Sequence, residues 1–504
     1  MGWPSKWDYE TDVAVLGYGG AGAVTAITAH DLGARVLLIE KQAADTPEQI
    51  RHTPSSRMSG GFFLCATDGQ KAAQYLFWSS WGATPEDCCR VMGEYMVSNE
   101  AYMTSLGGQV ARAEGFNGMC EYGDLAPGAD AIYMLHHAGN GPGQFKVLMD
   151  NVDRRQIPVL YAHRGNELIQ DPQSREILGL VAENNGQKVY IKAAKAVVLS
   201  TGGFEWNEEM KLNYLRTHPT YFYCNPANEG DGIKMGQRAG ADLWHMNTIS
   251  GRVIPYIQGV MPALGANFLT PFILVDKYGK RFATEPGDPD PARYRSHGFW
   301  LECTQFDSRN AEYPRIPCYQ IFDETTRRKG PVARSMRRGL LPDGRVQYFY
   351  EWSRDNRAEI HKGWIIQADS IKELARRIAA RDPENNHRMN PGLLGRTVTR
   401  FNRYCRSGLD HDFNRSLASL VPLEKPPFYA LKLHPGGPNT NGGLKKNARG
   451  QVLDPDGKVI QRLYAPGENG SYFGFLYSGG GNLCENLVWG RVTGENAAGE
   501  TSRG

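Results

Sequence analysis

A glycine-rich segment near the N-terminus, GYGGAG, has the residue types and spacing to bring backbone N–H groups up to a phosphate. Gly17 permits a tight turn, Gly19 lets the backbone approach a pyrophosphate, and Gly22 allows a helix to pack closely on a strand. The pyrophosphate then meets free N–H groups at the positive end of that helix. The segment therefore predicts a dinucleotide-binding loop, to which Gly20 and Ala21 also belong.

The elements predicted around this loop are in register with it. Residues 12–16 are a short apolar run typical of a buried parallel strand, residues 23–32 are predicted to form a helix, and residues 35–40 a second buried strand. Glu40 ends that second strand, 18 residues after Gly22, where a carboxylate accepts both ribose hydroxyls and disfavours a 2′-phosphate. A lone glycine motif is weak evidence, but here strand, helix, strand and acidic end agree.

Three further segments favour FAD over NAD as the dinucleotide. The first is a polar glycine loop soon after the βαβ unit, where a flavin ring needs backbone contact. The second follows an apolar strand, and the third is a strand that runs into a Gly-Glu turn near the C-terminus. They are Ser59-Gly60-Gly61, Thr201-Gly202-Gly203 and Tyr464-Ala465-Pro466-Gly467-Glu468. An NAD domain has no need of that C-terminal return.

Composition limits the class of protein. A chain of 504 residues suits two or three domains, and 41% hydrophobic with 22% charged residues is ordinary globular usage. The net charge of +3 gives no bias toward nucleic acid or an acidic membrane surface. The nine cysteines form no CxxC pair, so neither structural zinc nor an iron–sulfur cluster is expected. No signal core, twin arginine or long apolar run is present, and the chain is interpreted as cytoplasmic, without a transmembrane segment.

Changes in composition along the chain predict its domain organisation. From about residue 241 to 424, arginine, proline and aromatic residues become more frequent and the βαβ rhythm is lost. We therefore expect an α/β fold with a discontinuous, Rossmann-like FAD-binding domain, made of residues 1–240 and 425–504. An α+β cap domain, residues 241–424, is expected to be inserted into it.

Several shorter segments carry local signals. Residues 55–66 are predicted to be a loop, residues 85–106 helical, residues 189–203 two strands with a glycine turn, and residues 231–240 a helix with a glycine stop. The sequence VLDPDGKVI predicts a hairpin around Asp456-Gly457.

Taken together, these motifs resemble the flavoprotein superfamily that contains fumarate reductase and 3-ketosteroid Δ1-dehydrogenase. The similarity covers nearly the whole chain, through LGYGGAG…LLIEK, MSGG, LSTGGF, NEGDGIKMGQRAGA, LVDKYGKRFATE, FYALKLHPGGPNTNGGL and LYAPGENG…YSGGGN. The resemblance implies that Glu40 binds the adenosine ribose, that residues 59–61 line the isoalloxazine ring, and that Glu468 contacts the ribityl chain. It adds Lys41, Asn482 and Leu483 to the expected cofactor-binding residues.

The resemblance also bears on how FAD is attached. Some relatives attach it covalently through a histidine six residues before the paired glycine of the Ser59–Gly61 loop. Pro54 stands at that position here, and the nearest histidine is His52. We therefore expect non-covalent FAD, and we interpret His52 as a phosphate neighbour or a surface residue.

The flavin would supply the hydride chemistry, and the protein must place the substrate, polarise it and move a proton. Dehydrogenating a carbon beside a carbonyl needs a base for the α-proton and a hydrogen-bond donor for the developing enolate oxygen. In the ketosteroid dehydrogenase pattern the donors are a tyrosine hydroxyl and a glycine N–H, which correspond here to Tyr477 and Gly481. This chain departs from that pattern at Ser478 and Gly480 but keeps both donors. The competing interpretation is a structural glycine turn that carries a packed tyrosine.

The fumarate reductase pattern fits less well. In that pattern an arginine shortly before Gly-Gly-Asn holds a substrate carboxylate, and Ser478 occupies the equivalent position here. The family's His-Thr-Met-Gly-Gly is also absent, since this chain has His434-Pro435-Gly436-Gly437. We therefore expect a cyclic or steroid-like ketone or enone as substrate, rather than a small dicarboxylate.

Several residues are candidates for proton transfer. The family's base is a tyrosine shortly after Gly-x-Arg-Phe-x-Asn-Glu, which residues 279–285 resemble, so Tyr294 is the first candidate. A tyrosine acts as base only where cations such as Arg293 or Arg295 favour phenolate. Since fumarate reductases deliver a proton from an arginine in this region, either arginine could instead be the acid, and a plain surface loop is the third interpretation. Tyr122 loosely matches a second, helper tyrosine.

The leading hypothesis is an FAD-dependent oxidoreductase that acts on a CH–CH bond beside a carbonyl, as a dehydrogenase or as an enone reductase. Its electron acceptor or donor is unidentified. Arg293, Arg295 and His434 keep open a fumarate-reductase-like reductase of an unsaturated carboxylic acid, although His434 and His137 are also typical of structural histidines. A non-catalytic electron-relay flavoprotein would need FAD but no organised proton donor.

Overall fold

The computed structural model describes residues 4, 6–113, 120–260, 265–266, 268–286 and 295–503. Its larger sheet has eight strands, with the order β22-β23-β9-β1-β2-β6 and with β8 and β7 added at β9. The strands are β1 Tyr9–Leu16, β2 Val36–Ile39, β6 Val159–Leu160, β7 Arg164–Gln170, β8 Ile177–Asn184, β9 Gln187–Leu199, β22 Gln451–Leu453 and β23 Val459–Tyr464. The parallel core and the C-terminal return confirm the Rossmann-like fold predicted from the sequence.

The register of the central strands places three loops at one edge. Leu16 of β1 is paired with Ile39 of β2 and with Leu199 of β9, so all three parallel strands end at the same level. Tyr464 of β23 pairs with Val198, which brings the C-terminal segment to that level as well. In open α/β sheets, ligands bind outside the carboxyl ends of the strands. The four segments that follow these strands are therefore the ones positioned to hold a ligand.

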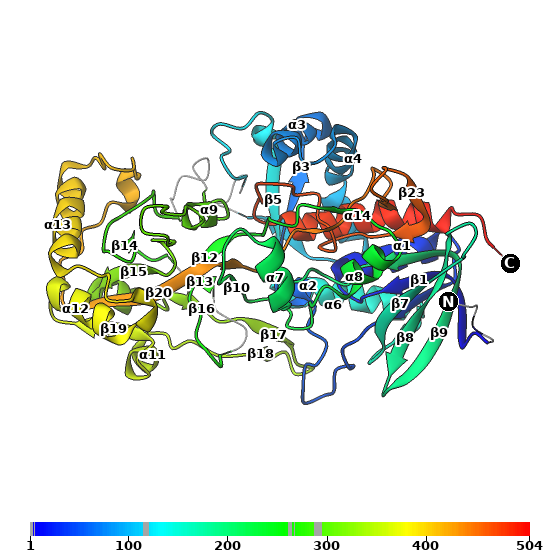
Figure 1. Ribbon diagram of the computed structural model, residues 1–504. Helices are drawn as coiled ribbons and strands as arrows, with labels where there is room; N and C mark the ends of the chain where they lie inside the picture. Colours follow the sequence, from blue (N-terminus) through cyan, green and yellow to red (C-terminus); the bar gives the residue numbers. More distant parts are fainter. Residues whose placement is uncertain are drawn as a thin grey trace.

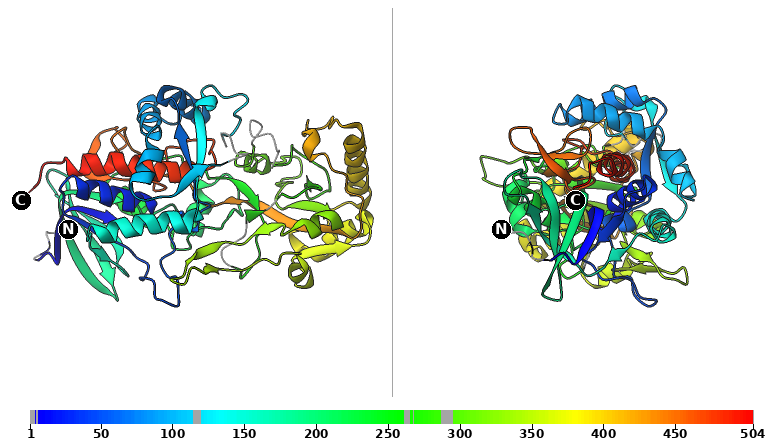
Figure 2. Two further views of the ribbon diagram at one scale, coloured as in Figure 1. Left: turned by 180° about the vertical axis from the view of Figure 1, so that it is seen from behind. Right: turned by 90° about the vertical axis from the view of Figure 1, so that its right-hand side faces the viewer.

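Two helices from opposite ends of the chain pack against each other over this sheet. Helix α1 (Gly20–Asp31) lies along helix α14 (Gly481–Ala498), as Figures 1 and 2 show. The helices approach closely because α14 carries glycine at the contact: a Cβ at Gly490 would lie 2.6 Å from Cβ of Val24, and one at Gly494 would lie 2.7 Å from Cβ of Thr28. The packing joins the first and last parts of the chain into one core.

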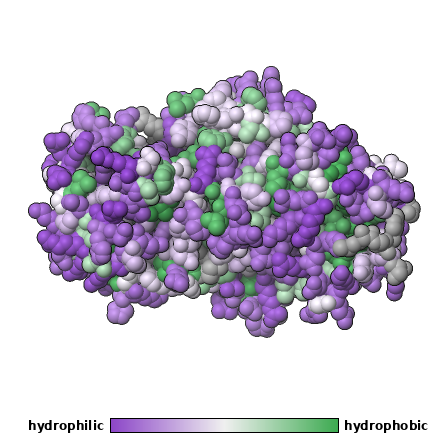
Figure 3. Space-filling view, viewed as in Figure 1, coloured by the Kyte–Doolittle hydropathy of each residue, from purple (hydrophilic) through white to green (hydrophobic). Residues whose placement is uncertain are grey.

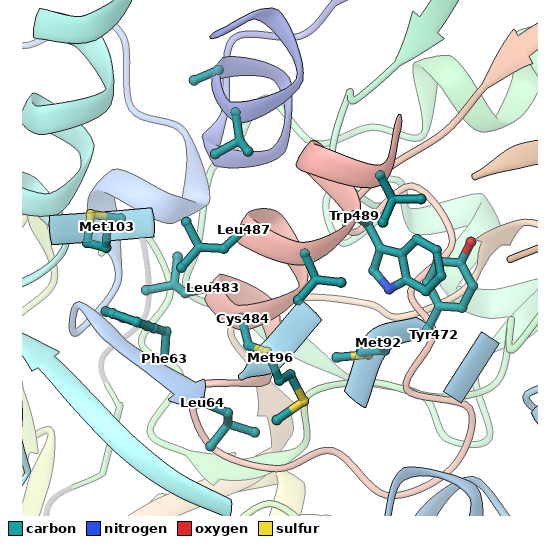
Figure 4. Packing of buried hydrophobic residues seen from close by; sticks show 14 of the residues in the cluster. Phe63, Leu64, Met92, Met96, Met103, Tyr472, Leu483, Cys484, Leu487 and Trp489 are labelled. Atoms are coloured by element: carbon teal, nitrogen blue, oxygen red, sulfur yellow. The ribbon is translucent and has the colours of Figure 1, made fainter. Parts of the chain in front are cut away.

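A smaller sheet, β3-β5-β4, covers the other side of α14. Its strands are β3 Phe62–Ala66, β5 Ile132–His137 and β4 Val110–Arg112, and the surrounding helices are α2 Ser55–Met58, α3 Gly69–Ser80, α4 Glu86–Met96, α5 Asn99–Ser105 and α6 Asn140–Arg154. Figure 4 shows the shared core, in which Leu483, Cys484 and Leu487 of α14 pack with Phe63 of β3 and Met96 of α4.

The second large sheet lies at the opposite end of the molecule (Figure 1) and is built around β20. Its strands are β10 Tyr221–Phe222, β12 Arg252–Ile254, β14 Phe272–Val275, β15 Cys318–Asp323, β19 Ile365–Ala368 and β20 Phe428–Gly437, with helices α12 Ile371–Arg381 and α13 Pro391–Ser407 packed beside it. Strand β20 leads from this sheet back toward the larger sheet. The boundaries at residues 240 and 424 stay a prediction.

The remaining elements are short. They are α7 Glu208–Tyr214, α8 Asp231–Arg238, α9 Trp300–Cys303, α10 Glu324–Lys329, α11 Arg357–His361, β11 Leu243–Trp244, β13 Gly265–Ala266, β16 Ala333–Arg334, β17 Arg337–Leu340, β18 Val346–Tyr348 and β21 Gly443–Leu444. No helix among the described residues is long and apolar enough to cross a membrane, and the face shown in Figure 3 is largely hydrophilic.

Local predictions had mixed outcomes. The helix predicted at residues 231–240 is α8, and the predicted hairpin is the antiparallel pair of β22 and β23. The loop predicted for residues 55–66 was wrong, because α2 and β3 form there. Residues 189–203 hold the end of one long strand, β9, rather than two. Strand β3 forms because it pairs with β5, and β9 is one long strand because it pairs along both β8 and β1.

Candidate functional site

A pocket lies at the shared edge where β1, β2 and β9 end. It encloses about 710 Å³ of space, part of it open to solvent. Its walls come from the loops after these strands, from α2 and from the C-terminal return. The lining residues include Gly17, Gly19, Gly20, Ala21, Glu40, Lys41, Thr201, Gly202 and Glu468, all of them predicted from the sequence to bind the cofactor.

The three motif glycines have different surroundings, and these fit a bound pyrophosphate. A Cβ at Gly17 or Gly22 would overlap backbone, the first at Ser200 and the second at Gly17 itself. A Cβ at Gly19 would meet only Pro54, at 3.7 Å, so this residue faces the pocket. Helix α1 begins here with no side-chain cap and no acidic residue in its first turn. The Gly20 N–H donates to the Ser56 hydroxyl at 3.0 Å. The other N–H groups of the first turn and the helix dipole suit an anion.

Glu40 is buried at the end of β2 and is held in place by backbone donors. Its two carboxylate oxygens accept hydrogen bonds from Tyr18 N–H at 2.9 Å and from Gln42 N–H at 2.8 Å. Burial raises the pKa of Glu40, but the His52 imidazole and the two N–H groups outweigh burial and leave this pKa below its usual value. The carboxylate is therefore ionised at neutral pH, as a group that accepts ribose hydroxyls must be.

The interpretation of His52 as a surface residue was wrong, and its place near a phosphate stays a prediction. Its side chain is 1% exposed, and its Nε2 lies 3.6 Å from Oε2 of Glu40. The ring packs against Tyr18, Phe145 and Tyr161, with centroid distances of 5.2 to 5.6 Å. Neither ring nitrogen has a hydrogen-bond partner within the described part of the chain. His52 therefore lies behind Glu40 as a buried polar neighbour of the carboxylate.

Replacing His52 with phenylalanine is expected to weaken FAD binding about tenfold, which corresponds to about 1.4 kcal/mol. Phenylalanine keeps the aromatic packing but removes the ring nitrogen that favours the charged form of Glu40. The measurement is a titration of flavin-free protein, followed by flavin fluorescence. Tyr161→Phe is the matched control, because it changes a ring of the same aromatic cluster and leaves the His52 imidazole in place. Equal affinity in wild type and His52→Phe would contradict this role.

Lys41 lies at the pocket edge but is already paired. Its Nζ lies 2.7 Å from Asp231 and 3.2 Å from Glu229, and Arg164 contacts the same two carboxylates. Its side chain therefore orders the acidic rim of the pocket. Because Lys41 and Arg164 balance the charges of these two carboxylates, it is Glu40 that disfavours a 2′-phosphate.

The segment after β9 lies under a network of buried polar side chains. Gly202 has φ of 72°, and a Cβ there would come within 2.5 to 2.7 Å of the Asn228 amide. That amide donates to Glu205 at 2.8 Å, and the Thr440 hydroxyl donates to the other Glu205 oxygen at 3.0 Å. Gly203 fits against Thr440 for the same reason, since it lacks a side chain. Glu205 was not predicted, although it directly follows the quoted LSTGGF motif.

The buried carboxyls near the pocket carry a testable pH dependence. Burial raises the pKa of Glu205 to about 7, and burial with the charges of Glu205 and Glu485 raises the pKa of Glu468 well above its usual range. A folded-state pKa above the unfolded value of 4.5 means that the folded protein holds a proton the unfolded chain has lost. This stability is complete below about pH 4.5 and is lost as the pH rises through 7.

We therefore expect the melting temperature of the flavin-free protein to fall between pH 5 and 7, by roughly 1 °C for each kcal/mol lost in a chain of this length. Glu205→Gln should flatten this slope, because glutamine cannot ionise. Glu94→Gln, which changes an exposed carboxylate, should leave it unchanged. A slope that survives in Glu205→Gln at full size would show that other groups cause it.

The remaining cofactor candidates lie beside the pocket rather than in its lining. Ser59 and Gly61 bond within their own turn, and a Cβ at Gly61, whose φ is 75°, would overlap Asn140. Gly467 packs on Ala21 with φ of 76°. The Asn482 side-chain amide donates to Asn439 Oδ1 at 2.5 Å. The Leu483 side chain points into the core shown in Figure 4, and its role in cofactor binding stays a prediction.

Tyr477 is the buried centre of the candidate catalytic region. Its hydroxyl oxygen accepts the Asn482 N–H at 3.1 Å, and burial raises the pKa of the phenol far above its usual value. The phenol therefore keeps its proton and can donate it in a hydrogen bond. The Gly481 N–H donates instead to Ser478 O at 2.9 Å. Ser478 in turn hydrogen-bonds Tyr75 through its hydroxyl, at 2.5 Å, and does not replace the missing arginine clamp.

Tyr122 and Arg295, two separately predicted candidates, lie together. The Arg295 guanidinium is 4.2 Å from the centre of the Tyr122 ring and lies 2.6 Å from Asp124. Burial and the Glu121 carboxyl raise the pKa of Tyr122, so its phenol suits a proton donor better than a base. Tyr294 and Arg293 lie outside the described residues.

Three residues that the sequence reasoning missed connect these groups: Glu121, Arg252 and His297. The His297 ring meets Tyr477 edge to face at 4.8 Å, and its Nε2 lies 2.9 Å from Nη2 of Arg252. Glu121 is fully buried and contacts the backbone of His297. The only signal in the sequence was adjacency, since Glu121 precedes Tyr122 and His297 follows Arg295 by two residues.

The two histidines interpreted as structural, His434 and His137, each make a hydrogen bond. His434 Nε2 lies 3.0 Å from Glu384, and the imidazole is the main cause that lowers the pKa of that carboxyl to about 2. His137 Nδ1 accepts the Gly139 N–H at 3.1 Å. Among the described residues, no group of three or more His, Cys, Asp or Glu side chains could hold a metal ion.

A family model described as an FAD binding domain matches residues 12–483. The chain is 28% identical to an NADH:acrylate oxidoreductase of Vibrio harveyi, over 99% of this chain but only 51% of that protein, so it spans about half of that relative's length. It is 26% identical to a digoxin reductase of Eggerthella lenta, over 98% of this chain and 88% of the relative. Its fold is similar to a crystal structure of 3-ketosteroid Δ1-dehydrogenase from Sterolibacterium denitrificans in complex with 1,4-androstadiene-3,17-dione. The TM-score is 0.80 at 20% identity, covering 97% of this chain and 99% of the other.

Proposed function

Because this chain belongs to the FAD binding domain family, we propose that it is an oxidoreductase that acts on a CH–CH bond beside the carbonyl of a cyclic or steroid-like ketone. Either direction, dehydrogenation or enone reduction, fits the site. The observation that carries the proposal is Tyr477, a buried phenol whose oxygen is fixed by Asn482 N–H and whose proton remains for a substrate oxygen. Such a donor stabilises the enolate that forms in both directions.

The residues present fit FAD, which supplies hydride transfer when bound. The N–H groups at the start of α1, reached across Gly19, would hold the pyrophosphate, and Glu40 would accept the ribose hydroxyls. Glu468 lies on the pocket wall where the chain returns from β23, and would contact the ribityl side.

We propose that FAD is held without a covalent bond. Pro54, which occupies the position of the attaching histidine in some relatives, lines the pocket and has no nucleophile. His52 lies two residues earlier, and its ring faces Glu40 within an aromatic cluster. Denaturing the purified protein should therefore release all of the yellow colour from the polypeptide.

Different residues of the chain would bind the substrate carbonyl and transfer the proton. Tyr477 would donate a hydrogen bond to the substrate carbonyl, and the Gly481 N–H would join it only after leaving Ser478 O. Tyr122, with its raised pKa and the Arg295 cation over its ring, suits delivery of a proton in the reductive direction. Tyr294 stays a prediction for the same proton transfer.

A second candidate, the reductase of an unsaturated carboxylic acid, is favoured by Arg252. Its guanidinium lies beside His297. Burial raises the pKa of Tyr477, and the Arg252 charge opposes this rise, so a positive charge is close to the proposed oxygen site. Three other groups count against this candidate, because Arg295 is paired with Asp124, His434 with Glu384, and Ser478 replaces the clamp arginine.

One experiment separates these functions. The flavin of the purified protein is photoreduced without oxygen, and 1,4-androstadiene-3,17-dione, acrylate or fumarate is added while the absorbance near 450 nm is followed. Reoxidation by the dienone, and not by the acids, is expected. Reoxidation by the acids alone would replace the ketone proposal with the second candidate. If no small molecule reoxidises the flavin but a redox protein does, the chain is an electron relay.

A further inference from the structure

Glu121 joins two segments that are far apart in the sequence. Its side chain is fully buried. One carboxyl oxygen accepts the His297 N–H at 2.6 Å, and the other accepts the Gly298 N–H at 3.0 Å. A carboxyl group with both oxygens on consecutive backbone amides holds that turn at two points.

The backbone of Glu121 is tied to the C-terminal motif on its other side. Its N–H donates to the Ser478 hydroxyl at 3.4 Å, and its carbonyl oxygen accepts the Tyr75 hydroxyl at 3.1 Å. Tyr75 and Ser478 are themselves hydrogen-bonded at 2.5 Å. Glu121 is therefore anchored next to Tyr477 through its backbone and reaches residues 295–298 through its side chain.

The turn that Glu121 holds carries the imidazole that lies against Tyr477. Nδ1 of His297 lies 3.2 Å from Gly251 O and takes the donor role, so Nε2 accepts from Arg252 at 2.9 Å. Burial keeps the pKa of His297 well below its usual value, so the ring is neutral. The position of the His297 ring, whose centroid lies 4.8 Å from that of the Tyr477 ring, thus depends on where the backbone of His297 lies.

The neighbours of Glu121 reinforce the same junction. Tyr122 packs under the Arg295 guanidinium, and Asp124 forms an ion pair with it. Gly298 packs closely on the same group: a Cβ there would lie 3.1 Å from Glu121 Oε2 and 3.2 Å from Cε2 of Tyr122, so these side chains would have to shift slightly. Residues 121–124 and 295–298 therefore form one junction between the two parts of the molecule.

We propose that Glu121 is a positioning residue of the active site, which holds residues 295–298 against Tyr477 and thereby sets the wall that orients the substrate carbonyl. The inference rests on the proposed function, because Tyr477 defines the substrate site. Burial raises the pKa of Glu121 to about 8 even though two N–H groups and the charges of Arg252 and Arg295 oppose the rise. Burying a carboxyl group is costly, and the two hydrogen bonds that Glu121 makes explain why one is present at this junction.

The test uses the flavin-loaded protein and Glu121→Gln. An amide has one acceptor oxygen, so its NH₂ group would face one of the two backbone N–H groups and break that bond. We expect kcat per bound flavin to fall about 10- to 100-fold, because small displacements of a positioning group have effects of this size. In Glu121→Gln, KM and flavin content should change by less than about threefold. The control is Asp130→Asn, which alters an exposed carboxylate paired with Lys71, and its kcat should also change by less than about threefold.

A second variant and a second measurement make the outcome independent of folding and of the substrate. Gly298→Ala pushes directly on Glu121 and should reproduce the loss of kcat. Hydrogen exchange of the peptide that contains residues 295–298 should speed up at least about tenfold in Glu121→Gln, because one of the two amides loses its acceptor. Unchanged exchange in this peptide overturns the inference whether or not the enzyme is active. Failure of wild type to turn over any ketone, with faster exchange in the variant, would reject the proposed function and leave the positioning role supported.

Discussion

Replacing Tyr477 with phenylalanine is expected to lower turnover by about 100- to 1,000-fold while the protein remains yellow. Loss of one donor to a developing oxyanion has effects of this size, because the donor acts where water is excluded. In this chain the phenol is buried, keeps its proton, and has its oxygen fixed by Asn482 N–H. The measurement is the rate of flavin reoxidation by 1,4-androstadiene-3,17-dione, normalised to bound flavin.

Tyr472→Phe is the matched control for that variant. Tyr472 lies five residues earlier, is equally buried and stacks on Trp489, and its hydroxyl donates to Asn447 O at 2.7 Å. Its loss should cost about 1 kcal/mol of stability but leave turnover nearly unchanged. If Tyr477→Phe turns over like wild type, the ketone proposal fails, because its one buried donor would then be dispensable.

Replacing Gly19 with leucine is expected to yield a folded but colourless protein. The backbone of Gly19 has φ of −91°, which any residue can adopt, and a Cβ there would meet only Pro54 at 3.7 Å. The added side chain would therefore fill the space in which the pyrophosphate must approach the start of α1. We expect FAD affinity to fall by a hundredfold or more, equivalent to about 3 kcal/mol, with an unchanged far-ultraviolet circular dichroism spectrum.

Gly22→Ala provides the contrasting variant. A Cβ at Gly22 would overlap Gly17 O, so even one methyl group forces helix α1 away from β1. This variant should lose melting temperature in the flavin-free protein as well, whereas Gly19→Leu should not. A yellow Gly19→Leu protein with normal affinity would remove the pyrophosphate from its assigned place.

The cofactor loop was predictable because its determinants are local. The turn at Gly17, the start of α1 and the acidic end of β2 lie within about 25 residues, and each is dictated by steric or hydrogen-bonding needs of a βαβ unit. His52 was misassigned because its environment is not local. Phe145 and Tyr161, which enclose it, are brought there by α6 and by the segment after β6.

The catalytic region was predicted only in part, and for a related reason. Tyr477, Tyr122 and Arg295 follow from motifs, but the motifs say nothing of what those side chains touch. The Gly481 N–H, expected to be a free donor, bonds to Ser478 O, and Leu483 turns into the core. Each outcome depends on how α14 begins and packs, which the order of residues in YSGGGN does not reveal.

By itself, the sequence determined a Rossmann-like FAD-binding chain whose two ends share one sheet, since glycine spacing and strand patterns are readable within single segments. Only the tertiary structure decided the partners of Tyr477. Glu121 and His297 are 176 positions apart and meet because a buried carboxyl must find N–H donors wherever the fold provides them. The chemistry of the site is therefore set by contacts between three segments of the chain. The sequence of each segment alone does not show which residues that segment contacts.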